Sequence, residues 1–260
     1  MERHSRLLRP APAILARLAR WGRAVLGLLY PKRCPFCDEV LGQLAACPAC
    51  EAAERALRRG VPRLAESEHL LTGLAGGAAV YRYEGAVRQA VLRMKAGGRA
   101  CYGPQLGAAM AEQLFGCRRQ NGEWPAAAGL RPPAALEYDC VIPVPSGGRR
   151  PYNPPGLLAK ELAAALGLPL AADALYKTHQ TPQQKSLDRA GRLCSLAGTF
   201  AVRPGQLAEN SRVLLVDDVV TTGATLTACA AALRRQGAAE VFAVCLAATP
   251  PPGSAPGAEP

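Results

Sequence analysis

The stretch at residues 213–225, VLLVDDVVTTGAT, decides the fold of this chain, because each third of it has a different chemistry. Its apolar residues 213–216 predict a buried strand that ends at Asp217 and Asp218. A helix is predicted at 226–236, and it is preceded by the small and hydroxyl residues Thr221, Thr222, Gly223, Ala224 and Thr225. Paired carboxylates accept hydrogen bonds from ribose hydroxyls, and the first amides of a helix bind anions. We therefore expect a diol site beside a phosphate site.

Two other classes of nucleotide-binding protein share parts of this pattern. The metal-binding strand of phosphate-loop ATPases also ends in acidic residues, but that class needs an upstream Gly-Lys-Ser/Thr sequence, and the chain contains no Gly-Lys pair. The three spaced glycines of a dinucleotide-binding fingerprint follow none of the predicted strands. A purely structural turn would not need two aspartates and three threonines around one glycine. The stretch resembles the phosphoribosyl pyrophosphate (PRPP) binding motif of type I phosphoribosyltransferases.

The composition predicts one substantial core with a small accessory module, since 49% of the 260 residues are hydrophobic. The formal net charge of +11 and the pI near 9.4 favour polyanionic ligands, either phosphates or nucleic acid. A chain rich in alanine, arginine, glycine and proline also gains basic charge from its overall composition. The net charge therefore does not decide between these explanations.

Residues 1–27 form a basic leader, in which Glu2 is the only acidic residue. Residues 14–29 place apolar side chains at helical spacing with arginines on the other face, which predicts an amphipathic helix. A signal peptide is the alternative, but arginines cut its apolar stretch to residues 24–30, which is too short to span a membrane. We expect a cytoplasmic protein with no transmembrane segment, whose leader binds a membrane surface, nucleic acid or its own domain.

Four of the ten cysteines form two Cys-x-x-Cys pairs, Cys34 with Cys37 and Cys47 with Cys50, separated by nine residues. Four thiolates on two tight turns can bind one ion tetrahedrally, which suits structural zinc. A redox-active dithiol is the alternative, but two pairs this close in a chain with no export signal favour zinc. The remaining cysteines stand singly in mostly apolar surroundings and are interpreted as small buried hydrophobes.

The rest of the chain alternates between strand and helix patterns. Strands are predicted at 76–83, 139–143, 168–175, 213–216 and 240–246, and helices at 51–59, 85–95, 104–118, 157–166 and 226–236. Residues 120–133 have the composition of a loop, and the proline- and glycine-rich tail at 248–260 is predicted to be disordered. This alternation predicts an α/β fold with a parallel sheet flanked by helices.

A second phosphate-binding turn is predicted after the strand at 139–143, because ligands gather at the carboxyl ends of parallel strands. Its residues are Val144, Pro145, Ser146, Gly147, Gly148, Arg149 and Arg150. Small residues leave backbone amides free, and the planar guanidinium of arginine suits a pyrophosphate group. A basic surface turn is the alternative, but the position of the turn in the chain favours the phosphate site.

The order of these parts resembles the ComF family of phosphoribosyltransferase-like proteins, which are linked to natural competence and DNA uptake. The resemblance covers about residues 26–247 and rests on the two Cys-x-x-Cys pairs, the segments 81–85 (YRYEG) and 92–95 (LRMK), the strand with Pro143-Val144-Pro145, and the Asp217-Asp218 motif. It implies a type I phosphoribosyltransferase-like fold with a small N-terminal four-cysteine zinc module. We accordingly expect a leader at 1–27, a zinc-finger module at 28–60, a phosphoribosyltransferase-like domain at 61–247 and a tail at 248–260.

The resemblance also implies roles for residues. Asp217 and Asp218 would hold the ribose hydroxyls, residues 221–225 the 5-phosphate, and residues 144–150 the pyrophosphate with magnesium, with a cis peptide expected near residues 144–146. We expect displacement of pyrophosphate from PRPP, with Arg149 and Arg150 neutralising the leaving group, the two aspartates countering charge on the ring, and a mobile hood at 177–192.

Two segments depart from the family pattern. After the second loop the family's Arg-Gly-Phe-Asn-Gln is replaced by Arg150-Pro151-Tyr152-Asn153-Pro154, and the family's Glu-Arg-x-x-Asn appears as residues 191–195, GRLCS. PRPP binding is therefore better supported than transfer to an acceptor base. A PRPP-sensing module that binds single-stranded DNA without turnover, acting with other DNA-uptake proteins, remains the alternative function.

Overall fold

The computed structural model describes residues 31–42, 44, 46–96, 99–120, 123–124, 138–147, 151–178 and 198–250. Four parallel strands form its main sheet in the order β1 (Gly76–Arg82), β6 (Glu240–Ala248), β5 (Arg212–Val220) and β2 (Cys140–Pro143). The basic leader, Arg149 and Arg150, and most of the predicted hood lie outside the described residues.

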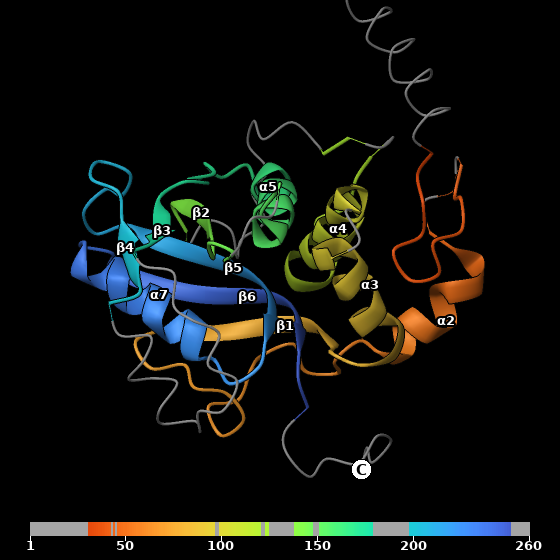
Figure 1. Ribbon diagram of the computed structural model, residues 1–260, viewed down its shortest axis with the longest axis horizontal. Helices are drawn as coiled ribbons and strands as arrows, with labels where there is room; N and C mark the ends of the chain where they lie inside the picture. Colours follow the sequence, from red (N-terminus) through yellow and green to blue (C-terminus); the bar gives the residue numbers. More distant parts are fainter. Residues whose placement is uncertain are drawn as a thin grey trace, which may run out of the picture.

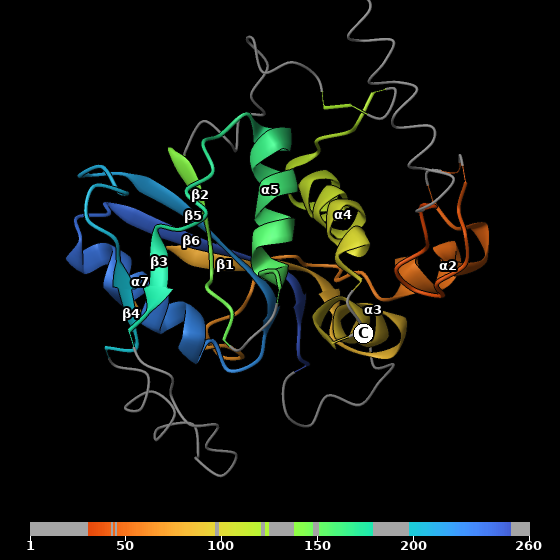
Figure 2. The ribbon, with the colours of Figure 1, turned by 45° about the horizontal axis from the view of Figure 1, so that its top comes forward.

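Helices cover both faces of this sheet (Figures 1 and 2). One face carries α3 (Gly85–Ala96), α4 (Gly103–Phe115) and α5 (Pro154–Leu166), and the short 3-10 helix η1 (Ala100–Tyr102) connects α3 to α4. The other face carries α7 (Ala224–Arg235) and an antiparallel ribbon of β3 (Leu175–Lys177) and β4 (Phe200–Val202). The predicted α/β class with a parallel sheet flanked by helices is confirmed.

Alternation along β5 explains why both faces are apolar. Leu214 and Val216 pack into the core shared with α4 and α5, whereas Val213 and Leu215 pack into the core shared with α7. Successive side chains of a strand point to opposite faces, so a continuous apolar run requires a layer on each side. Each fully buried side chain of this size contributes about 1.5–3 kcal/mol.

Several predicted boundaries change. The strand expected at 168–175 is wrong: only Leu170 bridges Val141 there, because proline and turn residues interrupt the pattern, and β3 begins at Leu175. β4 was not predicted. The strand expected to end at Asp217 continues to Val220, because Val219 and Val220 pair with Ala247 and Ala248 of β6.

Both edges of the sheet are covered. Residues 57–64 run antiparallel along β1, with hydrogen bonds from Arg59 N to Val80 O (2.8 Å) and from Leu64 N to Gly77 O (2.8 Å). At the other edge, Val141 N donates to Pro169 O (2.9 Å) and Ala171 N donates to Val141 O (2.9 Å). Neither outer strand therefore presents its full row of amides and carbonyls to solvent.

The cysteine pairs belong to a small module beside α3 and α4, from which helix α2 (Pro48–Ala56) leads to the edge of β1. Within α2, buried Glu54 accepts hydrogen bonds from the guanidinium of Arg58 (2.8 and 2.9 Å) and from the hydroxyl of Tyr81 on β1.

None of the helices in the described part of the chain has both the length and the apolar character that a membrane-spanning helix needs.

Candidate functional site

Two adjacent carboxylates lie inside β5, near its carboxyl end. Asp217 and Asp218 are 8% and 4% exposed, which is rare for charged side chains without partners. The neighbouring strand β2 ends at Pro143, opposite Val216, and the chain leaves the sheet after Val144 N donates to Val216 O (2.8 Å). The pair therefore borders the place where the second predicted loop begins.

Each carboxylate faces a different environment, because consecutive strand residues point to opposite faces. Asp218 faces α3, where the Nζ of Lys95 lies 2.6 Å from its Oδ1. Asp217 accepts a hydrogen bond from the Asp218 amide (2.8 Å) and lies on the side of α7. Burial, and then the neighbouring Asp218 carboxylate, raise the pKa of Asp217 well above its usual range, and Lys95 and Lys177 offset this only in part.

Replacing Asp217 by asparagine is expected to stabilise the protein increasingly as the pH rises. A carboxyl whose folded-state pKa is raised stabilises the fold fully below its unfolded pKa of about 3.9, and this contribution is lost as the pH rises through the folded-state pKa. The amide does not titrate, so the melting temperature of the variant relative to the parent should increase between about pH 4 and pH 8 and then level off. Thermal denaturation with the exposed-site variant Asp173→Asn as control measures this, and a pH-independent difference would contradict it.

The predicted phosphate loop connects β5 to α7. Thr221 is exposed, Thr222 and Thr225 are half-buried, and Gly223 and Ala224 are buried. Among the described residues, no partner is found for the backbone N–H groups of Thr222, Gly223 and Thr225. These groups stand at the amino end of α7, where the helix dipole also favours an anion.

A distant segment clamps this loop from outside. Leu70 N donates to Thr222 O (2.8 Å), Leu70 O accepts from the hydroxyl of Thr227 (3.0 Å), and Nδ1 of buried His69 lies 2.8 Å from Thr221 O. Gly223 has φ = +84°, and a Cβ built on it would lie 2.1 Å from Leu70 O. Only glycine fits between the loop and its clamp at this point.

The second loop is held by Asn153, which precedes α5. Its side chain accepts a hydrogen bond from Ser146 N (3.2 Å) and donates to Val144 O (3.1 Å), so it does not cap its own helix. Pro154 and Pro155 occupy the first turn of α5 and lack the amides that such a cap would satisfy. The expected cis peptide near residues 144–146 is wrong, since the described part of the chain contains only trans peptide bonds.

Lysine supplies the positive charge that the structure describes around this loop. A Cβ built on Gly147 would lie 2.8 Å from the Nζ of Lys177, which projects from β3. Lys177 and Thr178 are the part of the predicted hood that the structure describes. Gly147 therefore leaves room for a cation beside the loop that was expected to hold pyrophosphate.

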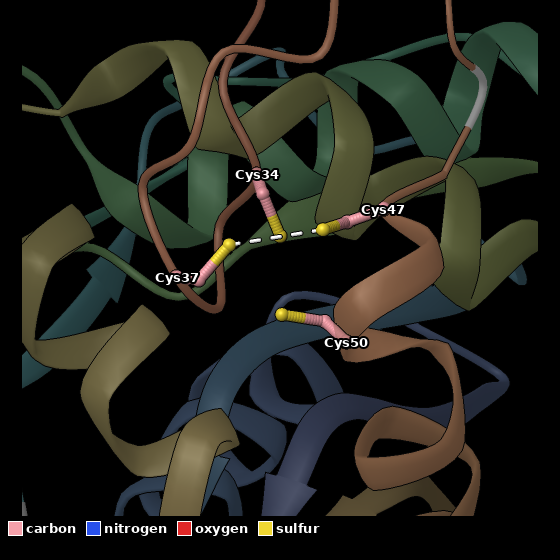
Figure 3. Close-up of side chains that lie close together, drawn as sticks. All are labelled: Cys34, Cys37, Cys47 and Cys50. Carbon is pink, nitrogen blue, oxygen red and sulfur yellow. Dashed lines mark hydrogen bonds between the residues drawn. The ribbon is translucent and has the colours of Figure 1, made fainter.

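The four cysteine sulfurs converge on one point (Figure 3). All four Sγ atoms lie within 4.8 Å of one another, and the Sγ atoms of Cys37 and Cys47 are 3.7 Å apart. Tetrahedral zinc with Zn–S bonds of about 2.3 Å requires S···S distances of about 3.8 Å. Burial, and then the neighbouring thiols, raise the pKa of Cys50, so four thiolates can coexist here only around a cation. The cluster is compatible with a structural zinc site.

Polar contacts fix the cysteine module to the helices. The Asp38 carboxylate, between the two pairs, accepts hydrogen bonds from Tyr102 (2.5 Å) and Arg99 (3.0 Å), and Arg93 donates to Phe36 O (2.9 Å). The ring of Phe36 also meets Tyr81 edge-on, with centroids 6.3 Å apart. The module is thus packed against the rest of the protein.

Sequence reasoning missed several residues around the carboxylates and the loops. Lys95 belonged to a segment that marked the family resemblance but had no assigned role, and nothing local to Leu70 or His69 pointed to a loop about 150 residues away in sequence. The one available signal was Asn153 before two prolines, which is typical of a helix start. Arg149 and Arg150 lie outside the described residues.

Comparisons with known proteins agree with this arrangement. Residues 131–256 match the family described as phosphoribosyl transferase domain. The chain is 32% identical over 111 residues to competence protein F of Haemophilus influenzae (40% of this chain, 47% of that protein) and 34% identical over 101 residues to DNA utilization protein YhgH of Escherichia coli K12 (39% and 44%). The chain therefore spans about half the length of the curated relatives that it matches.

A solved structure described as the allosteric regulatory enzyme of purine biosynthesis is 23% identical, covers 55% of this chain and 25% of its own, and gives a TM-score of 0.34. A superposition at that level carries no argument about the site. Residues 131–256 match the phosphoribosyl transferase domain family, and the chain is similar to competence protein F and DNA utilization protein YhgH, with a four-cysteine cluster nearer its N-terminus.

Proposed function

We propose that this protein binds PRPP with magnesium and transfers its ribose 5-phosphate group with release of pyrophosphate. The observation that carries the proposal is the continuity of β5 with the phosphate loop: a buried carboxylate pair and, a few residues later, unengaged amides at the amino end of α7. A ribose with hydroxyls on carbons 2 and 3 and a phosphate on carbon 5 can contact both of these features at once.

The residues would divide the work as follows. The amides of residues 222–225 would bind the 5-phosphate. The Asp217 and Asp218 carboxyls would accept hydrogen bonds from the ribose hydroxyls and so fix the ring. As the bond to pyrophosphate lengthens, positive charge develops on the sugar, and the Asp218 carboxylate stabilises it. Magnesium, when bound with PRPP, would neutralise pyrophosphate charge, and the carboxylate and phosphate oxygens are the ligands that it prefers. Residues 144–147, braced by Asn153, would hold the leaving group, and Arg149 and Arg150 are proposed to assist.

We propose that zinc on Cys34, Cys37, Cys47 and Cys50 is structural. A site closed by four cysteines has no open position for water, so its role is in folding. The names of the relatives point to competence and DNA utilization, and we place this protein in the same process. Single-stranded DNA and other DNA-uptake proteins are the partners that this role implies, in the cytoplasm.

Calorimetric titration with PRPP and magnesium tests the binding proposal. We expect saturable binding by the parent, and at least about tenfold weaker binding by Asp218→Asn, because hydrogen bonds to a charged acceptor contribute about 1.5–3 kcal/mol. Asp173→Asn, on an exposed turn before β3, removes the same charge far from the carboxylate pair and should bind like the parent. If the parent does not bind PRPP, the proposal fails.

Pyrophosphate release across a panel of purine and pyrimidine bases separates the two functions. Release with one acceptor supports transfer. Binding without release for any acceptor, together with a PRPP-dependent change in affinity for single-stranded DNA, would favour the PRPP-sensing module. The net charge of +11 makes salt concentration a required control in the DNA measurement, since nonspecific binding falls steeply with salt.

A further inference from the structure

One contact in the site, between Lys95 and Asp218, has no role in the proposed function. Lys95, in the last turn of α3, places its Nζ 2.6 Å from the Oδ1 of Asp218. The side chain of Asp218 is 6% exposed and that of Lys95 is 27% exposed, so the pair is shielded on the carboxylate side and open to solvent on the lysine side. Removal of the lysine would leave the buried carboxylate without a charged partner, which is costly.

This contact occupies an oxygen that the ribose needs. If Asp218 accepts a sugar hydroxyl, as the proposed function requires, the ammonium and the hydroxyl compete for the same carboxylate. A carboxylate oxygen has lone pairs for more than one donor. However, the Nζ of Lys95, 2.6 Å from the Oδ1 of Asp218, already occupies the closest donor position at that oxygen. A sugar ligand must therefore share the carboxylate with Lys95 or displace it.

The surroundings indicate where the lysine would go. The hydroxyl of Tyr152 donates to the carbonyl of Met94 (2.5 Å), so the backbone next to Lys95 is tied to the segment that follows the second loop. Asn153, the next residue, holds Val144 and Ser146 of that loop. The backbone beside Lys95 is thus linked through residues 152 and 153 to the proposed pyrophosphate loop, and its ammonium is carried on a flexible stem of four carbons.

We propose that Lys95 selects for the pyrophosphate group: it neutralises Asp218 in the empty site and moves to the pyrophosphate oxygens when PRPP binds. This inference rests on the proposed function and names the pyrophosphate group as the feature of the ligand that the site recognises. Ribose 5-phosphate offers the hydroxyls and the 5-phosphate but gives Lys95 no new partner. Of the two ligands, only PRPP carries a pyrophosphate group, which gives the Lys95 ammonium a new partner when it leaves Asp218.

The proposal predicts opposite effects on two ligands, which calorimetry with PRPP·Mg and with ribose 5-phosphate can measure. In Lys95→Met, the Kd for PRPP should rise at least about tenfold, because one charge-assisted contact is lost. The Kd for ribose 5-phosphate should stay the same or fall, because the competing ammonium is gone. Lys95→Arg keeps the charge and should preserve the preference for PRPP within about threefold.

The ratio of the two Kd values within one preparation does not depend on how much of a variant is folded, so a partly misfolded variant still gives an answer. Lys160→Met removes an exposed lysine on α5 and should leave both Kd values unchanged. Parallel weakening of both ligands in Lys95→Met would make Lys95 a merely structural partner of Asp218 and overturn the proposal, as would no change in either. A parent protein that binds neither ligand would refute the proposed function itself.

Discussion

Removal of zinc is expected to unfold the cysteine module and to destabilise the whole chain by at least about 3 kcal/mol, since zinc binding by such sites contributes apparent free energies of about 10–16 kcal/mol in isolated peptides. The module is small, and the convergence of four sulfurs within 4.8 Å is its central feature. Without a cation, neighbouring thiolates repel one another or must take up protons. The contacts of Asp38 with Tyr102 and Arg99 would then lose the loop that positions them.

The matched test compares Cys50→Ser with Cys101→Ser, because Cys50 points into the cluster and Cys101 is exposed outside it. We expect the purified parent to release one zinc ion per cluster upon thiol modification, and Cys50→Ser to lose zinc and melt at a markedly lower temperature. Cys101→Ser should match the parent in both. A parent that contains no metal and does not change its melting temperature with a chelator would exclude the structural zinc site.

Replacing Gly223 by alanine should abolish phosphate binding and cost about 3 kcal/mol or more of stability. Two penalties combine at this position: a backbone angle of φ = +84°, which costs about 1–3 kcal/mol for a residue with a Cβ, and a contact of 2.1 Å between that Cβ and Leu70 O. The carbonyl belongs to backbone that is itself bonded to Thr222 and Thr227, so it cannot move without releasing the loop.

Gly205→Ala separates the two penalties. Gly205 also has a left-handed backbone, with φ = +73°, but nothing lies within 4 Å of a Cβ built on it. It should lose about 1 kcal/mol from backbone strain and bind PRPP like the parent. Equal loss of stability and unchanged PRPP binding in both variants would mean that the clamp at Leu70 does not shape the phosphate loop.

The sequence allowed the parallel sheet to be predicted because its strands are apolar runs between helical patterns, and both signals are local. It also allowed the cysteine cluster to be predicted, since ligand spacing is a covalent property of the chain. The exact end of β5 was not predictable in this way. Two aspartates in a strand look like its end, but pairing of Val219 and Val220 with β6 outweighs their polarity.

The surroundings of the site could not be predicted, because they come from distant segments. Lys95 reaches Asp218 across 123 residues only after α3 packs on the sheet, and Leu70 meets Gly223 only after the chain has crossed the molecule. Asn153 shows a different limit: its position before Pro154 and Pro155 indicates the helix start, but its side chain turns to residues 144 and 146. Local pattern gives position along the chain, whereas partners depend on the fold.

The covered edges of the sheet affect how readily this protein aggregates at high concentration. A parallel sheet with an open outer strand can recruit a strand from a neighbouring copy and begin an aggregate. Here residues 57–64 along β1 and residues 169–171 along β2 already use those hydrogen-bonding groups. Residues 57–64 continue the chain of the cysteine module, so the module also positions the segment that prevents two copies from pairing through β1.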